Sequence, residues 1–237
     1  MKLIKNILKF SKEIIITYIL SYLLIFILCL IYTLLGYQDL TSFMNTYCVY
    51  ISLLYYIVVI IYLYKRNKQK EPILPKKKYF PLLCLGISLA ILLNMIIFLI
   101  IPPQPTKSTL SPLLLLISSG IIGPIYEEIL FRYLLYNRLN KKYNSKKAIL
   151  VTTIIFAIIH LSAIKIIYAF ILGLVINIAY EKNQHILAPI LIHMAANSIV
   201  LLLHEYNTYI LLLSIINLVI SVKLNLIDTK KVISVSN

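Results

Sequence analysis

Long apolar segments are the feature that most constrains how this chain folds. Four of them, at about 13–36, 43–64, 80–101 and 112–136, are long enough to cross a bilayer, which takes about 20 mostly apolar residues in a helix. Hydrophobic residues make up 61% of the 237 residues, which is more than the core of a soluble domain needs. The sequence therefore predicts an all-α, polytopic membrane protein.

Four further apolar segments are shorter and are interrupted by polar residues, at about 147–161, 164–180, 186–204 and 208–222. Counted as spans, they bring the predicted helical bundle to about eight transmembrane helices. Twenty of the 23 Lys and Arg residues then fall in segments on one side of the membrane. Because Lys and Arg in short loops collect on the cytoplasmic side, we expect both termini to be cytoplasmic.

The net charge of +15 indicates contact with anionic lipid headgroups, because the basic residues lie in short loops beside the spans. Nucleic acid is not an expected partner, since these loops lack the basic and aromatic interleaving of a strand-binding surface. The basic, proline-containing linker suggests three parts. We expect two accessory spans and the linker in residues 1–79, the functional core in 80–222, and a cytoplasmic tail in 223–237.

Charged residues inside the fourth apolar segment are the strongest functional signal. One charge at a helix centre costs about 2.5–3.5 kcal/mol on insertion scales, and this segment contains Glu127, Glu128 and Arg132. Glu128 and Arg132 are four residues apart and share a helix face, whereas Glu127 points elsewhere. We expect a structural ion pair between Glu128 and Arg132, which leaves Glu127 free to act as a general base. A cluster that only locks helix packing is the alternative.

Three polar residues in later spans extend this pattern. His160 ends the fifth apolar segment, and His193 and Asn197 share a face of the seventh. At a rise of about 1.5 Å per residue, Glu127, His160 and His193 lie about 15, 20 and 10 Å from the inner ends of their helices. A lone histidine is more often a packing residue, but the conjunction predicts one cavity, in the inner half of the bilayer, that gathers all of them.

At these residues the sequence resembles the CPBP intramembrane peptidases, also called the CAAX protease and bacteriocin-processing family. EEILFR fits the first motif of that family, FAIIH the second and HMAAN the fourth, in the expected order and spacing. Gly173 is compatible with the weaker third motif. The resemblance covers about residues 80–222. It implies an eight-span fold that opens toward the cytoplasm and hydrolyses a peptide bond of a membrane-associated peptide or protein.

Matching positions assigns the residues their roles. The resemblance implies that Glu127 and His160 activate a water molecule, while His193 and Asn197 hydrogen-bond the developing oxyanion. Glu127, His160 and His193 could instead supply three zinc ligands with an open fourth position. The sequence has no evident carboxylate to orient the histidines, so we expect a metal-free mechanism with no cofactor.

Two other classes of protein remain compatible with these residues. A non-catalytic membrane immunity or scaffold protein could use the same bundle to bind a bacteriocin without cleaving it. A transporter or proton relay would also contain intramembrane Glu and His, although the chain shows no inverted repeat. The bias toward Ile, Lys, Asn and Tyr suggests a bacterial plasma membrane.

The charge distribution generates a topological prediction. Cysteines introduced in place of Lys70 and Lys142 should react with a membrane-permeant thiol reagent and resist an impermeant one added to intact cells, because both loops are expected inside. Labelling of either position by the impermeant reagent would contradict the predicted orientation.

Overall fold

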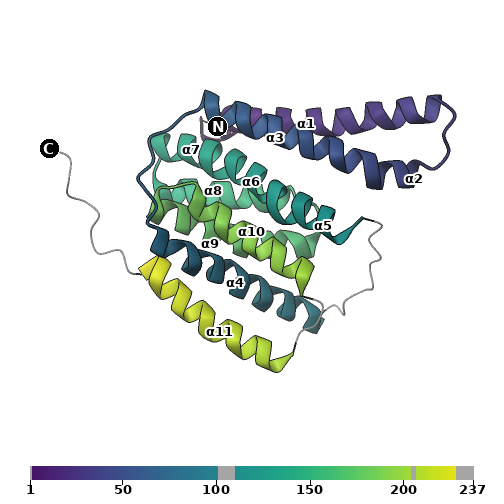
Figure 1. Cartoon of the computed structure of the whole chain (residues 1–237). Coiled ribbons are helices and arrows are strands. Elements are labelled where there is room, and N and C mark those ends of the chain that lie inside the picture. Colours follow the sequence, from purple (N-terminus) through teal and green to yellow (C-terminus); the bar gives the residue numbers. More distant parts are fainter. Residues whose placement is uncertain (1, 101–109, 204–206, 228–237) are drawn as a thin grey trace.

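The computed structural model describes residues 2–100, 110–203 and 207–227, and these ranges are helical with no strand (Figure 1). Within these described ranges, six helices are long and apolar enough to cross a membrane: Lys5–Leu34, Val49–Arg66, Lys76–Ile100, Pro112–Lys142, Ala163–Asn183 and Thr208–Asn225. The prediction of an all-α, polytopic membrane protein is confirmed. The segments expected at 147–161 and 186–204 form helices of only 14 and 16 residues, so their crossing stays a prediction.

The first two spans form a hairpin. Helix α1 (Lys2–Leu34) is followed by the short α2 (Leu40–Phe43), a π-helical turn η1 (Met44–Cys48) and α3 (Val49–Arg66). The reversal passes through Gly36, whose φ of 85° suits glycine, and Asp39 caps α2 by accepting from the Ser42 amide. One end of the hairpin extends beyond the rest of the bundle (Figure 1).

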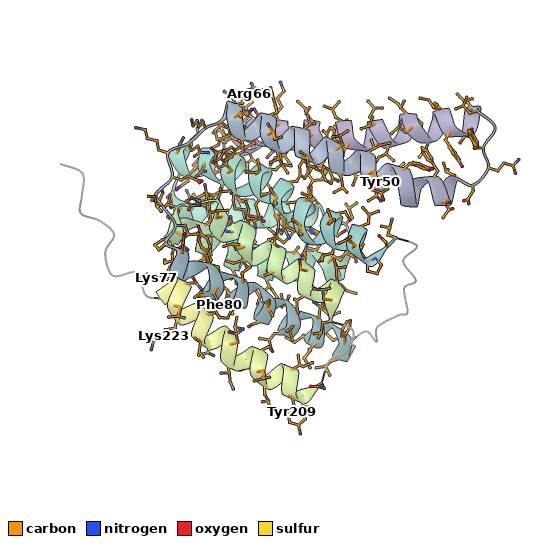
Figure 2. All side chains as sticks on the ribbon, viewed as in Figure 1. Tyr50, Arg66, Lys77, Phe80, Tyr209 and Lys223 are labelled. Atoms are coloured by element: carbon orange, nitrogen blue, oxygen red, sulfur yellow. The ribbon has the colours of Figure 1, made fainter. Side chains whose placement is uncertain are left out.

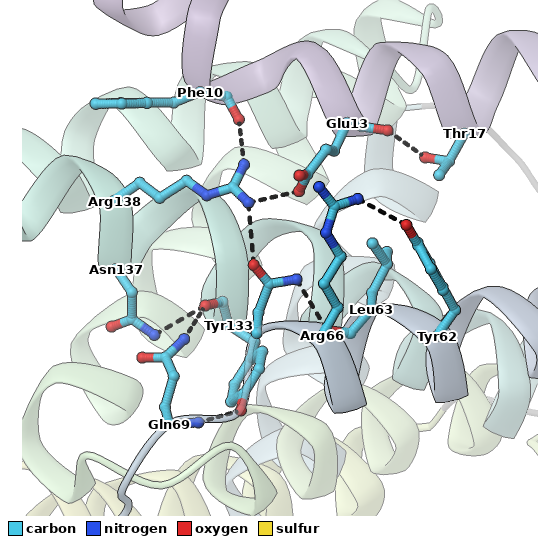
Figure 3. A network of polar contacts seen from close by, with 11 residues as sticks. Phe10, Glu13, Thr17, Tyr62, Leu63, Arg66, Gln69, Tyr133, Asn137 and Arg138 are labelled. Carbon is cyan, nitrogen blue, oxygen red and sulfur yellow. Dashed lines mark hydrogen bonds and ion pairs between the residues drawn. The ribbon is translucent and has the colours of Figure 1, made fainter.

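Polar contacts anchor the other end of the hairpin to the core (Figure 3). Arg138, in α7 (Asn137–Lys142), donates to a carboxylate oxygen of Glu13 at 2.5 Å and to the carbonyl oxygen of Phe10 at 3.2 Å. It also donates to the side-chain oxygen of Asn67, at the end of α3, at 3.3 Å. One guanidinium therefore ties both hairpin helices to the core.

The linker between α3 and α4 (Tyr79–Ile100) is also bound to the core. The Gln69 amide N–H donates to the Tyr133 hydroxyl at 2.8 Å, and the Glu71 carboxylate accepts from the Ile186 N–H at 3.2 Å. Burial raises the pKa of the Glu71 carboxyl and lowers the pKa of neighbouring His185. A 3-10 turn, η2 (Lys76–Lys78), then leads into α4.

The core surrounds the irregular fourth span. That span comprises α5 (Pro112–Leu115), η3 (Leu116–Ile122), α6 (Gly123–Glu128), η4 (Ile129–Tyr136) and α7. It is followed by α8 (Ser145–Ile158), α9 (Ala163–Asn183), α10 (Leu187–Leu202), α11 (Thr208–Val222) and η5 (Lys223–Ile227). Helices α4 and α10 pack very closely at Gly86, where an added Cβ would lie 2.1 Å from the Ile192 carbonyl oxygen. This contact fixes the helix that carries His193.

Basic residues gather at one end of the bundle. Figure 2 labels Arg66, Lys77 and Lys223 there, and the α7–α8 loop lies at the same end because α6 and α7 run toward it (Figure 1). The clustering predicted from the sequence is therefore present in the fold. We refer below to this part of the molecule as the basic end.

Candidate active site

The backbone of the fourth span is opened just before its two glutamates. Pro124 has no N–H, so the Gly120 carbonyl oxygen loses its usual helical donor and instead accepts from the Ser198 hydroxyl at 3.3 Å. In the π-helical turn η3, the Gly123 N–H bonds to the Ser118 carbonyl. The Ser119 carbonyl is thereby left to accept from the Asn197 side-chain amide at 3.1 Å. Side chains of α10 thus replace missing backbone bonds, an irregularity often found at functional sites.

Arg132 and Glu128 form a fully buried ion pair. The guanidinium donates to the Glu128 Oε1 at 2.9 Å, and both side chains are 0% exposed. The same guanidinium donates to the Gly173 carbonyl oxygen at 3.2 Å and lies 4.4 Å from the centre of the Phe156 ring. A Cβ at Gly173 would come within 2.9 Å of that ring. The guanidinium therefore needs a residue without a side chain at position 173.

His193 is held by a second contact of Glu128. Its Nδ1 lies 2.7 Å from Glu128 Oε1, and since a carboxylate accepts, Nδ1 carries the proton. The Nε2 then faces Glu127, whose Oε2 lies 3.8 Å away. The expectation that no carboxylate orients the histidines is therefore wrong for His193. Glu128 therefore binds both Arg132 and His193, and the sequence predicted the first of these contacts but not the second.

Glu127 occupies a different environment from its neighbour. Its side chain is 26% exposed, whereas Glu128 is completely buried. It lines a cavity of about 440 Å³ together with Asn197. The adjacent positions of the two glutamates on the helix therefore place one carboxylate in the packed core and the other in open space.

His160 ends α8. Its backbone N–H bonds to the Ala157 carbonyl at 3.1 Å, so the Phe156 carbonyl oxygen is available to accept from the His160 Nδ1 at 2.9 Å. The next residue, Leu161, has a φ of 59° and turns the chain away. The His160 ring packs edge-on against Phe156 and is close enough to Glu127 for an electrostatic interaction. It is not among the residues that line the cavity.

The cavity lies away from the basic end. Its lining runs from Met44 and Leu110, near the opposite end of the bundle, to Glu127. On the other side of Glu127 every residue of η4 is buried, so packed side chains close that route. The prediction of a cavity in the half that carries the basic loops, opening toward those loops, is therefore wrong. The π-helical turn and Pro124 open the backbone only on the far side.

One wall of the cavity was not identified from the sequence. It is formed by the hairpin, and Cys48, Ser52 and Tyr56 recur on it at intervals of four residues. This spacing in an otherwise apolar span was the available signal, since residues four apart share a helix face. The assignment of residues 1–79 as accessory overlooked it.

The zinc alternative was tested against the side-chain arrangement. Across the described ranges, no three His, Cys, Asp or Glu side chains are placed to hold a metal ion. The Nδ1 of His193 bonds to Glu128 and that of His160 to a carbonyl oxygen, which leaves each Nε2 free and is by itself compatible with a metal ligand, so the misfit lies in the spacing of the three side chains. The arrangement does not fit a zinc site of Glu127, His160 and His193.

Comparison with known proteins finds sequences similar to the segment that carries this site. Residues 109–199 match the family model Type II CAAX prenyl endopeptidase Rce1-like. The chain is 33% identical over 92 residues to YdiL of Bacillus subtilis (strain 168), which carries the name of a membrane peptidase. It is 26% identical over 151 residues to MroQ of Staphylococcus aureus (strain USA300), named as a membrane-embedded CAAX protease.

These alignments cover 39% and 56% of this chain, and 37% and 61% of the two relatives. No solved structure matches significantly. The matched segment contains all six residues singled out in the sequence. Residues 109–199 are thus similar to the Rce1-like CAAX prenyl endopeptidases, and the chain, like the two relatives, is a multi-pass membrane protein.

The buried ion pair generates a stability prediction. Arg132→Ala should lower the yield of folded protein and its melting temperature, because an unpaired buried carboxylate typically costs about 3–5 kcal/mol. Thermal unfolding in detergent measures this. Lys146→Ala removes the same charge from an exposed position and should leave the melting temperature unchanged; equal behaviour of the two variants would contradict a structural role for Arg132.

Proposed function

We propose that this protein is an intramembrane endopeptidase that hydrolyses a peptide bond of a membrane-associated peptide or protein. The observation that carries this proposal is the unequal placement of the two adjacent glutamates. Glu128 is fully buried between Arg132 and His193, while Glu127 stands in the cavity within 3.8 Å of the His193 Nε2. The family's name and those of its relatives support the same class of reaction.

The charges of the cluster suggest where a catalytic proton resides. Arg132 and Glu128 neutralise each other, so ionised Glu127 beside a neutral His193 would leave one net negative charge in an apolar site. Binding one proton between Glu127 and His193 makes the cluster neutral, which a poorly solvated environment favours. Of Glu127 and His193, one group can then accept a proton while the other holds or releases one.

Water attack follows from this pairing. The 3.8 Å separation is too long for a direct hydrogen bond, but a single water molecule can contact both groups. Glu127 accepts a proton from that water, and the hydroxide oxygen bonds to the scissile carbonyl carbon. The proton then passes to the departing amine nitrogen as the C–N bond breaks.

Three further groups assist the step. His193, when doubly protonated, donates from Nε2 to the developing oxyanion, and the Asn197 side-chain amide is the second donor. His160 donates from Nδ1 to a carbonyl oxygen, so its neutral form offers Nε2 as an acceptor that assists Glu127 in orienting the water. No metal ion enters these steps.

For the membrane arrangement, we propose eight spans with both termini and the basic end in the cytoplasm, in a bacterial plasma membrane. Helices α8 and α10 then cross as the two shortest of the eight spans. Under this arrangement the cavity faces the outer half of the bilayer, and anionic headgroups contact the basic end.

Glu127→Gln should abolish cleavage and leave membrane abundance and melting temperature near those of the wild type, because it keeps the shape but removes the base. Asn197→Ala should be milder, at about 100- to 1,000-fold slower, the usual cost of one oxyanion donor. The assay is mass spectrometry of apolar membrane peptides incubated with each purified variant at matched levels.

Two outcomes would contradict the proposal. Full function of Glu127→Gln would favour a non-catalytic membrane immunity or scaffold protein that binds a bacteriocin, in which a packing glutamate tolerates this change. Loss of wild-type cleavage with a chelator, restored by zinc, would contradict the metal-free mechanism.

A further inference from the structure

The cavity has two walls of different origin. One comes from the segment that matches the family, residues 109–199, and contributes Glu127 and Asn197. The other comes from η1 and α3 of the hairpin, which lie outside the matched segment: Met44, Cys48, Val49, Ser52, Leu53 and Tyr56. In Figure 1, α3 runs beside α5 and α6, which brings the two walls face to face. The reacting groups therefore face a surface that is not part of the family match.

Contacts with residues before and after Glu127 in the fourth span, Tyr126 and Arg138, hold the hairpin wall in position. Tyr56 stacks on Tyr126 of α6, with ring centres 4.3 Å apart, and the Tyr55 hydroxyl donates to the Thr17 carbonyl oxygen of α1 at 2.7 Å. Arg138 secures the same helices nearer the basic end. The wall is therefore fixed relative to Glu127, as a surface that measures a substrate side chain must be.

Ser52 is the middle one of the three residues Cys48, Ser52 and Tyr56 that recur on this wall. It lies one helical turn from Cys48 and one from Tyr56, on the same face of the helix. Its side chain is the smallest of the three, and it lines the same cavity as Glu127. The rest of the hairpin wall is mainly apolar, which suits an apolar side chain, while the serines at 118 and 119 on the facing wall offer polar groups to a peptide backbone.

We propose that α3 is the substrate-recognition wall, and that Ser52 sets the size of the apolar side chain accepted next to the scissile bond. The occupant is an extended apolar segment of a membrane-bound peptide. This inference rests on the proposed peptidase function for its kinetic consequence. Its structural consequence, that a peptide in the cavity contacts Ser52, holds whether or not cleavage follows.

The kinetic test uses membrane-anchored synthetic peptides that differ only in the residue beside the cleaved bond: Gly, Ala, Val, Leu or Phe. Ser52→Leu should change the ratio of kcat/KM between the Leu and Ala peptides by at least about tenfold toward Ala, because one methylene in a hydrophobic pocket already changes such ratios 10- to 200-fold. Val58→Leu enlarges a side chain that is 56% exposed on the same helix and should leave the ratio unchanged. An unchanged ratio in Ser52→Leu would overturn the proposal.

A second measurement is independent of catalysis. A photo-crosslinking amino acid is placed at position 52 or 58 of the Glu127→Gln variant, in membrane vesicles that contain the same peptides. Crosslinking at 52 that greatly exceeds crosslinking at 58 is expected. Such crosslinking without wild-type cleavage would keep the recognition wall and reject the peptidase, whereas equal or absent crosslinking at both positions would reject the wall.

Discussion

The fully buried contact between Arg132 and Glu128 is the interaction on which the rest of the site depends. A charge inside a membrane helix is costly unless it is paired, and here the guanidinium is also bound by a carbonyl oxygen of α9 and an aromatic ring of α8. Three helices therefore meet at one cation. Because Glu128 Oε1 also accepts from His193, this packing arrangement fixes an imidazole of α10 in a chosen tautomer beside Glu127.

Helix geometry places the two adjacent glutamates in different environments. Successive residues rotate by about 100° around a helix, so Glu128 enters the packed core while Glu127 faces the cavity. The proline and the π-helical turn before them remove backbone donors, and Asn197 and Ser198 of α10 compensate for that loss. The same irregularity leaves open space on one side of Glu127, and the continuous buried segment η4 closes the other. The two glutamates and the cavity beside Glu127 thus arise from one stretch of the fourth span.

Sequence reasoning reached the helical class, the polar residues and the pairing of Glu128 with Arg132, because intramembrane charges stand out in apolar segments and a four-residue spacing has one geometric meaning. It did not find the contact between Glu128 and His193, two residues that are 65 positions apart in the chain and lie on different helices. It also placed the cavity in the wrong half, since distances along single helices ignore the packing of η4. The hairpin wall was missed because Ser52 and Tyr56 are ordinary residues for a membrane span. Their four-residue spacing was the available signal, and the fold adds that both side chains line the cavity that Glu127 lines.

In the proposed mechanism, Glu127 activates water and does not attack the peptide itself. Single-turnover cleavage in oxygen-18-labelled water, with protein in molar excess over an apolar membrane peptide, tests this most directly. We expect one labelled oxygen in the new carboxyl group of essentially every first-turnover product, as measured by mass spectrometry. Unlabelled first-turnover product would mean that a protein carboxylate had donated the oxygen through a covalent intermediate, and would contradict direct attack by water.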